Sequence, residues 1–313
     1  MTTYGPAGPR VKQARVACTR LALEQDCAQF PGPHHVVVES TGGWDWLADT
    51  LAALRGELVL AHATRLQAIA AAKVKTDQVD SDILALLLRA DLIPRPPMIR
   101  PEARGPRDLM RPRLRLVAQS VSAQHSIDRL LEKCNRESVA DLDALYQLPA
   151  TCHAAQIQLL DDQIRMLERA RYPYRVPSAD GQRLLWIPGR GPVTAFTLYT
   201  EIDGISRFPS PRQFFSSCRL VPGADNSAGR TRHRSGSKVG SRYRKLAFSH
   251  AGIRAVPYYP EIRAFFKTKA RKTPIRIARP LVGLALARIV YHVLATPEDF
   301  TGRFKTRPLR RPT

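Results

Sequence analysis

Three carboxylates have the types and positions that a metal-dependent reaction requires. Glu39 ends a short β-branched run, and Asp77 and Asp80 stand three residues apart. On the first turn of a helix this spacing projects both Asp side chains to one side. Carboxylates at the carboxyl ends of parallel strands line the crevice where α/β sheets place active sites. Such a cluster needs a cation, and Mg²⁺ suits oxygen ligands beside phosphates. A second interpretation stays open, in which Asp77 and Asp80 are acids that stabilise a helix N-terminus.

The elements that would hold these carboxylates follow the pattern of a parallel α/β sheet. Apolar and β-branched residues at the spacing of strands and helices predict two strands and three helices. These are strands at His35–Glu39 and Glu57–Ala61, and helices at Trp44–Arg55, Thr64–Ala72 and Ser81–Arg89. Alternation of strand and helix is typical of a parallel sheet. The Pro-rich stretch 93–98 closes this region and has the composition of a linker.

The region from about Arg104 to Ala170 has mostly helical spacing. Apolar residues three and four apart among polar ones predict an amphipathic helix, and they are Ile157, Leu160, Ile164 and Leu167. A coiled-coil arm and an ordinary helix against its own core explain this pattern equally well. Pro112 removes a helical hydrogen bond, so we expect a helix to break or to start there.

A glycine-containing turn precedes the next apolar helix. Trp186–Pro192 is followed by helical spacing over Val193–Ile202 and resembles the turn of a helix-hairpin-helix. In such a turn, glycines let backbone amides at a helix N-terminus approach a phosphate. We therefore take Gly189 and Gly191 as candidate nucleic-acid contacts. This signal alone is weak, because many loops contain the same pattern.

A Gly-, Ser- and Arg-rich segment over 223–240 runs into a basic helix from Ser241. Positive residues of one sign gather here, and they are Arg230, Arg232, Arg234, Lys238, Arg242, Arg244 and Lys245. A solvated face is the usual fate of a charge run. A flexible run this rich in Arg suits a phosphate backbone better, so we expect these residues to bind nucleic acid. Residues Lys267 to Arg311 add further basic residues around an apolar helix at Pro280–Leu294.

The charge of the whole chain points to the same class of partner. There are 49 Lys and Arg against 27 Asp and Glu, which gives a net charge of +22. A polyanion is the expected partner of such a chain, because phosphate neutralisation releases counterions. Apolar runs such as Leu281–Leu294 are too short and too interrupted to predict a membrane span, and the N-terminus lacks a signal-peptide core. Five dispersed cysteines fit a reducing compartment, so we expect a cytoplasmic, nucleoid-associated protein.

Several motifs together resemble one family. In chain order they are Val38–Trp44, Lys75–Asp80, Ile187–Pro192, Glu201–Phe208 and Leu220–Gly223. In this order they look like insertion-sequence transposases with an Asp-Glu-Asp-Asp, RuvC-like (RNase H-like) N-terminal domain. These are the bridge-RNA-guided recombinases that carry a serine and are related to the Piv invertases. The resemblance implies an α/β plus α protein: a RuvC-like domain at 1–100, a helical or coiled-coil region at 101–180, and a mostly helical transposase domain at 181–313.

The resemblance also implies roles for particular residues. Glu39, Asp77 and Asp80 match three of the family's four acids, which bind Mg²⁺. The family's nucleophilic serine follows the Leu-Val-Pro motif, and Ser227 in the segment Asp225–Arg230 matches it, with an alanine in place of one glycine. A serine that attacks a phosphate needs activation and a stabilised leaving oxygen, which a metal and nearby Arg supply. DNA, a structured guide RNA and further copies of the chain (a dimer or tetramer) are the partners implied.

One departure from the family concerns its first Asp, which lies on an opening strand in a Gly-Ile-Asp-like motif. That motif is not present here, and Asp26 is a poor substitute because its surroundings have helical spacing. We expect an N-terminal truncation, or a start site placed too late, to account for the difference. Two alternatives to a DNA recombinase follow. One is a nucleic-acid-binding remnant without catalysis, and the other is a RuvC-like nuclease that does not use a serine.

Overall fold

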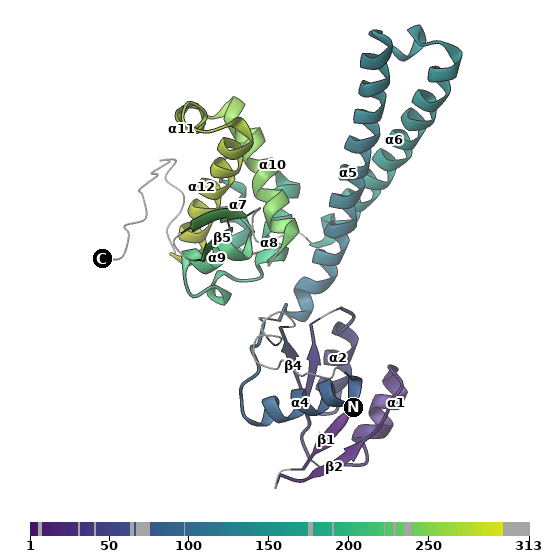
Figure 1. Ribbon diagram of the computed structural model, residues 1–313, viewed down its shortest axis with the longest axis vertical. Helices are drawn as coiled ribbons and strands as arrows, with labels where there is room; N and C mark the ends of the chain where they lie inside the picture. The colour runs from purple at the N-terminus through teal and green to yellow at the C-terminus, as the bar shows by residue number, and fades with distance from the viewer. Residues whose placement is uncertain are drawn as a thin grey trace. The chain divides into compact units, whose positions relative to one another are not determined.

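The structure is a computed structural model. It describes residues 1–5, 8–30, 32–40, 42–62, 66, 76–96, 98–174, 178–189, 191–221, 223–227, 230–234 and 240–296, with the backbone alone in 223–227 and 230–234. Helices predominate and the few strands are short, which is compatible with the expected α/β plus α class (Figure 1). The chain divides into two compact units, Met1–Met98 and Ile99–Thr313. The predicted helical region and the predicted transposase domain therefore share the second unit.

The first unit contains the predicted strand–helix–strand unit. Strands β3 (His35–Glu39) and β4 (Glu57–Ala61) pair in parallel, with helix α2 (Asp45–Ala53) between them in the chain. Four of the five residues of β4 are buried, and they alternate between two clusters. Leu58 and Leu60 pack with Leu51 of α2, whereas Val59 and Ala61 belong to a second core. A strand buried on both faces is typical of parallel α/β sheets, so these predicted elements are confirmed.

A short antiparallel hairpin was not predicted. Strands β1 (Thr2–Tyr4) and β2 (Arg10–Gln13) pair with each other and lie against helix α4 (Asp77–Arg89). The hydroxyl of Tyr4 donates to Asp82 at 2.8 Å, and those of Thr2 and Ser81 are 2.8 Å apart. These hydrogen bonds hold the three-residue strand β1 against α4. The strand has no alternation of apolar and polar residues, so the sequence pattern did not predict it. Of the predicted helix Thr64–Ala72, only Leu66 lies within the described residues.

Helix α1 (Arg20–Cys27) follows the hairpin, as helical spacing around Asp26 predicted. Asp26 is buried, and its carboxylate pairs with the ammonium group of Lys12 at 2.5 Å. The residue is therefore engaged in an internal ion pair between α1 and β2, which agrees with its dismissal as a catalytic acid.

The second unit begins with a long helical hairpin. Helices α5 (Pro101–Cys134) and α6 (Ala144–Ala170) run side by side, joined by a short 3-10 turn at Val139–Asp141 (Figure 1). Leu160 and Ile164, on the predicted apolar face of α6, are buried. The predicted break at Pro112 is wrong, because α5 continues through it. Met110 and Leu114 are buried on either side of Pro112, so packing outweighs the lost hydrogen bond.

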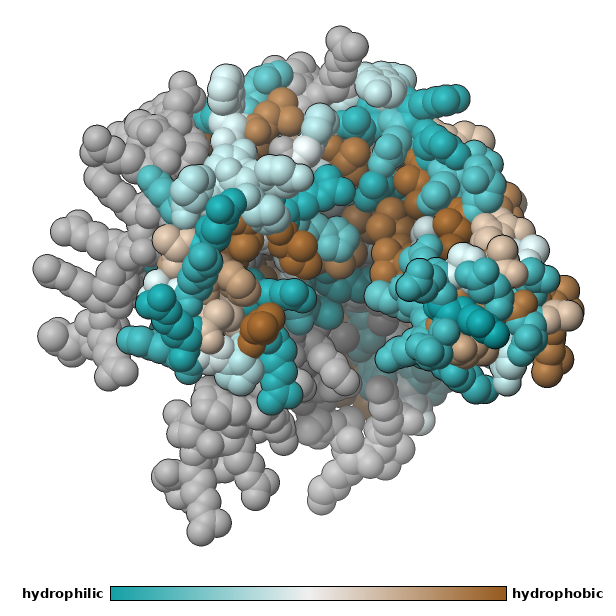
Figure 2. All heavy atoms as spheres, turned by 90° about the horizontal axis from the view of Figure 1, so that it is seen from above, coloured by the Kyte–Doolittle hydropathy of each residue, from teal (hydrophilic) through white to brown (hydrophobic). Residues whose placement is uncertain are grey.

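Helix α6 also has a second apolar face, which does not contact α5. Its large exposed apolar side chains are Leu145, Leu148, Leu159 and Met166. Leu145, the exposed Cys152, Leu159 and Met166 follow one another at intervals of seven residues. Hydrophobic side chains are visible among hydrophilic ones on the surface in Figure 2. A period of seven is the spacing with which one helix meets another in a coiled coil.

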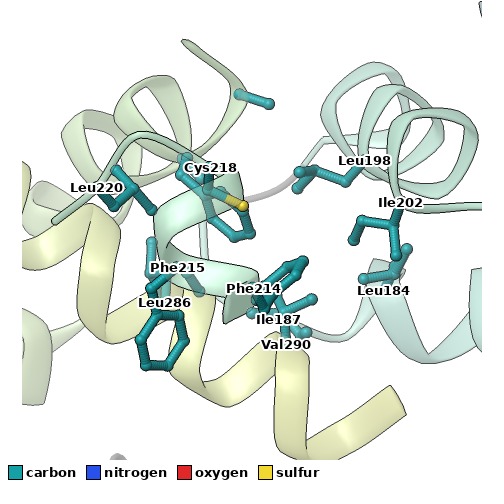
Figure 3. Packing of buried hydrophobic residues seen from close by; sticks show 14 of the residues in the cluster. Leu184, Ile187, Leu198, Ile202, Phe214, Phe215, Cys218, Leu220, Leu286 and Val290 are labelled. Atoms are coloured by element: carbon teal, nitrogen blue, oxygen red, sulfur yellow. The ribbon is translucent and has the colours of Figure 1, made fainter. Parts of the chain in front are cut away.

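The remaining helices surround one apolar core. They are α7 (Ala179–Leu185), α8 (Pro192–Ile202), α9 (Pro211–Ser217), α10 (Arg242–Tyr258), α11 (Pro260–Ala270) and α12 (Ile275–Ala295). Phe214 of α9 is fully buried, with its ring 6.1 Å from that of Phe248 and 5.8 Å from that of Tyr291. Figure 3 shows Phe214 among Ile187, Leu286 and Val290. The short helix α9 is thus held by aromatic side chains of α10 and α12.

Helix α12 is longer and more apolar than expected. Its length and composition are those of a helix that crosses a membrane, contrary to the prediction that no run was long enough. The prediction failed because Arg and His were counted as interruptions, although the helix spans 21 residues. Its residues Val282, Leu286 and Val290 are almost completely buried against α9 and α10. This burial is typical of a core helix, and a core helix can have the same length and apolar composition as a membrane-spanning one.

Candidate functional site

Ser227 ends the first strand of a small β-hairpin in the second unit. Strands β5 (Gly223–Ser227) and β6 (Arg230–Arg234) are antiparallel, and Ser227 pairs with Arg230. This is the last pair of the ladder, at the end where β5 stops and β6 begins. Asp225 pairs with Arg232 further down the ladder. The structure therefore brings the backbone of Ser227 beside the predicted phosphate-binding residues of β6.

The described chain is fixed on either side of this hairpin. Before it, Leu220 is buried in the core. After it, the amide of Ser241 donates to the carbonyl of Ser217 at 2.8 Å, and Arg219 Nε donates to the carbonyl of Gly240 at 2.7 Å. Gly240 has a φ of +115°, and a Cβ there would lie 2.4 Å from the Ser217 oxygen. Only glycine fits this approach, so the C-terminal end of α9 anchors the return of the chain into α10.

A buried carboxylate joins this anchor to the long helical hairpin. Glu201 near the end of α8 accepts a hydrogen bond from the Ser241 hydroxyl at 2.8 Å and one from Arg111 Nε at 2.7 Å. Burial alone would lower the pKa of Arg111, but the hydrogen bond and charge of Glu201 outweigh it and raise that pKa. The Arg111 guanidinium also lies 4.8 Å from the ring centre of Tyr243. The start of α10 is therefore fixed to both α8 and α5.

A second buried carboxylate fixes the N-terminal end of α5. The side chain of Asp203 is 0% exposed and accepts from the backbone amide and the Nε of Arg100, both at 2.8 Å. This hydrogen bond raises the pKa of Arg100. Arg207 lies 3.9 Å from the same carboxylate. Burial lowers the pKa of Arg207, and the nearby positive charge of Arg244 adds to that effect.

The predicted nucleic-acid-binding residues divide into separate groups. Arg242 and Lys245 are exposed on the first turn of α10, and Arg242 donates to the Tyr243 hydroxyl at 2.9 Å. Arg244 instead turns inward over the ring of Phe208, at 5.1 Å, and burial lowers its pKa. The backbones of Arg230, Arg232 and Arg234 form β6, whereas Lys238 lies outside the described residues. Within the described chain, Arg242 and Lys245 are thus the predicted contacts with exposed side chains.

The two glycines of the predicted helix-hairpin-helix turn differ in their surroundings. They lie between α7 and α8, as expected. Gly189 has a φ of +76°, and a Cβ there would lie 2.1 Å from the carbonyl oxygen of Ala251 in α10. Gly191 is the N-cap residue of α8, and a Cβ there would meet nothing within 4 Å. Gly189 is therefore needed for packing against α10, whereas Gly191 leaves the helix N-terminus open.

The three carboxylates of the first unit lie at the ends of regular elements. Glu39 ends β3, and Asp77 and Asp80 occupy the first turn of α4. The hydroxyl of Thr76 accepts from the amide of Val79, so α4 has an ordinary side-chain N-cap. In the described ranges, no group of three or more His, Cys, Asp or Glu side chains could hold a metal ion. Glu39, Asp77 and Asp80 therefore do not form such a group, and a role in binding Mg²⁺ stays a prediction. The capped first turn of α4 is compatible with the helix-stabilising alternative for the two Asp residues.

Several residues of this site were not assigned a role from the sequence. Glu201 and Asp203 were seen only as part of a motif, and Arg100, Arg111 and Ser241 were not considered. A signal did exist, because Glu201 is the one charged residue in the otherwise uncharged segment Pro192–Ile202. An acid within an apolar helix predicts a buried partner. The buried position of Arg244 could also have been read from its spacing with Phe248, Ala251 and Ala255 on α10.

Comparison with known proteins finds one family similarity in the second unit. Residues 181–267 match the sequence model of a family described as the transposase IS116/IS110/IS902 family. A search of curated proteins gives no match. The matched stretch includes α8 with Glu201, the hairpin with Ser227, and helix α10. This match supports the function of an insertion-sequence transposase, and hence a DNA-binding enzyme.

Proposed function

We propose that this protein cuts and joins DNA strands with Ser227 as the nucleophile. The observation that carries this proposal is the place of Ser227 within the family match and at the end of β5. The chain around the hairpin is held by contacts of Gly240 and Arg219 and by the buried carboxylate of Glu201. A site held on rigid elements positions a nucleophile better than a free loop does.

The proposed chemistry is a transesterification. The Ser227 oxygen attacks a phosphorus atom of the DNA backbone and forms a phosphoserine bond, while the bond from phosphorus to a sugar oxygen breaks. The serine proton passes to a base, and the sugar oxygen leaves as a hydroxyl. In the joining step, a sugar hydroxyl attacks the phosphoserine and restores the serine. Arginines near a phosphate stabilise the charge that develops on its oxygens, and β6 and α10 carry such residues.

Ser227→Ala tests this proposal directly. The variant should lose strand joining and the covalent protein–DNA intermediate, which denaturing gels detect, and should bind a DNA duplex as the parent chain does. Ser235→Ala, in the same Arg-rich segment, is the matched control and should keep both activities. Undiminished joining by Ser227→Ala would remove this serine from the mechanism. Free cut ends without a covalent intermediate would indicate a RuvC-like nuclease, and binding without cleavage would indicate a remnant.

A requirement for Mg²⁺ stays a prediction, and we derive no step from it. A RuvC-like fold of the first unit, and roles for Glu39, Asp77 and Asp80 in catalysis, belong to the same proposal. Glu39→Gln should abolish strand joining if this unit supplies a catalytic site. The measurement is the Mg²⁺ dependence of joining in the parent chain and in this variant.

We further propose that a structured guide RNA and other copies of the chain take part. RNA that co-purifies with the protein, and that joining requires, would support the first partner. The outward face of α6, where Leu145, Leu159 and Met166 stand fourteen and seven residues apart, supports pairing of arms between copies. Replacing these three side chains by Gln should lower the mass in light scattering, whereas an unchanged mass would exclude this face. We place this activity in the cytoplasm, at the nucleoid.

A further inference from the structure

The turn between α11 and α12 presents a compact group of positive side chains. Five of them are exposed within thirteen residues, and they are Lys267, Arg271, Lys272, Arg276 and Arg279. The same segment holds no Asp, Glu, Asn or Gln. This group lies outside the hairpin and the first turn of α10, where nucleic-acid contacts were predicted.

These cations lack acidic partners within the part of the chain that the structure describes. From residue 262 to 296 the sequence contains no Asp or Glu. None of the five forms an ion pair with another described residue. Like charges four residues apart on a helix, such as Lys267 and Arg271, destabilise it by about 0.2–0.5 kcal/mol. Because these positive charges repel one another, a nearby anion would stabilise the arrangement.

A neighbouring arginine shows what a structural cation looks like in this segment. Arg263 of α11 donates to the backbone carbonyls of Val256 and Pro257 at the end of α10. It satisfies carbonyl groups that the end of a helix leaves open. Of the five exposed cations, none has a hydrogen bond of this kind among the described residues. Below them, Ile262, Ala278 and Val282 are buried in the core, so the turn is held in place.

We propose that this surface, the α11–α12 turn, binds the phosphate backbone of duplex DNA. Contacts of Lys and Arg side chains with phosphates carry no sequence information, so binding here should not depend on sequence. The choice of DNA as the polyanion rests on the proposed transposase function. Ile275 and Ile277 are 56% and 47% exposed beside the cations, which makes an anionic membrane the competing partner. Two isolated isoleucines offer little insertion area, and the other apolar side of α12 is buried in the core.

The test compares two variants of the full chain with equal changes in charge. In the first, all five cations of the α11–α12 turn are changed to Gln. In the matched control, five exposed cations of the long helical hairpin are changed to Gln, and they are Arg115, Arg129, Lys133, Arg136 and Arg169. Affinity for a 30-base-pair duplex is measured between about 50 and 200 mM salt. Over this range, affinity that depends on phosphate contacts falls steeply. Thermal unfolding of each variant verifies that it folds.

The slope of log affinity against log salt should fall by about 0.9 for each lost phosphate contact. The turn variant should therefore lose about 4 units of slope, equally for duplexes of different sequence, while the control keeps its slope. Equal loss in both variants would reduce the effect to net charge and overturn the proposal. The proposal would also be overturned if the turn variant kept its salt slope for DNA but no longer bound phosphatidylserine vesicles, because the partner would then be a membrane. A protein that never joins strands but shows the expected slope would contradict the catalytic proposal and leave this surface standing.

Discussion

The two units differ completely in charge. Met1–Met98 contains 10 Lys and Arg and 10 Asp and Glu, whereas the rest of the chain contains 39 and 17. The whole excess, 39 − 17 = +22, therefore lies in the second unit. The second unit therefore provides the long-range electrostatic attraction for a polyanion, because the electrostatic potential far from a protein depends on its net charge. The first unit is neutral and has no general attraction of its own, so any contact it makes with nucleic acid has to be local.

The units also place their candidate residues in different ways. In the first, Glu39 and Asp77 stand at the ends of regular elements, and Asp77 is exposed. In the second, Glu201 and Asp203 are buried between segments about a hundred residues apart in the chain. The comparison teaches that acids in the second unit hold the fold around the candidate site. In the first unit, Asp77 stands exposed at a helix end, so it is not one of the buried acids that join distant segments.

The largest expected effect comes from the buried carboxylate. Glu201→Gln keeps the shape of the side chain and removes its charge. Arg111 then keeps only the more distant Asp108, at 3.9 Å, and Arg244 loses the attraction of Glu201. We expect a loss of about 2–3 kcal/mol in the free energy of unfolding, below the usual 3–5 because Arg111 is partly exposed. Urea denaturation measures it. The control Asp162→Asn breaks an exposed pair with Arg165 and should cost less than about 0.5 kcal/mol. Equal costs would remove the distinction between buried and exposed acids.

A glycine pair tests whether packing or phosphate contact explains the turn before α8. Gly189→Ala should destabilise the chain by about 2 kcal/mol, because its Cβ meets the Ala251 carbonyl and its φ is positive. Gly191→Ala has open space and should cost under about 1 kcal/mol. If Gly191→Ala instead weakens DNA binding at unchanged stability, the open glycine is the phosphate contact. A tolerated Gly189→Ala would show that the turn does not pack as described.

The exposed Asp77 of the neutral unit should matter little for folding. Asp77→Asn removes a charge that interacts with the N-terminus of α4 and should cost about 0.5 kcal/mol. Thr76→Ala removes the N-cap hydrogen bond and should cost about 1 kcal/mol. Urea denaturation together with a joining assay checks both. If Asp77→Asn abolishes joining while Thr76→Ala does not, Asp77 acts in chemistry. Equal activity in the two variants would leave Asp77 as a helix-stabilising residue.

The smallest effect concerns pH. Burial lowers the pKa of His250 on α10, and the charges of Arg113 and Arg254 lower it further. The unfolded chain, with a His pKa of about 6.5, then binds the proton more readily than the folded chain does. This contribution to stability is complete above pH 6.5 and is lost as the pH falls toward the lowered pKa. His250→Gln should flatten the dependence of urea midpoint on pH between 7 and 5. If the urea midpoint of the variant changed with pH as it does in the parent chain, other titratable groups would account for the pH dependence.

The amino-acid sequence by itself determined the net charge, the parallel strand–helix–strand unit and the amphipathic face of α6. These features depend only on residue types and on the spacing of residues close together in the chain, so they can be predicted without knowledge of tertiary contacts. Ser227 stays a proposal from a family resemblance, and it lies within the segment that the family match covers.

Only the tertiary structure decided the rest. It continued α5 through Pro112, added the β1–β2 hairpin and turned Arg244 inward. It also assigned Gly189 to packing and paired Glu201 with Arg111 across ninety residues of chain. Each of these outcomes depends on a contact between segments distant in sequence. A buried charge needs a partner, because leaving it unpaired costs more free energy than the secondary-structure preference of a few residues can offset. A Cβ that overlaps a neighbouring backbone atom is unfavourable for the same reason of scale.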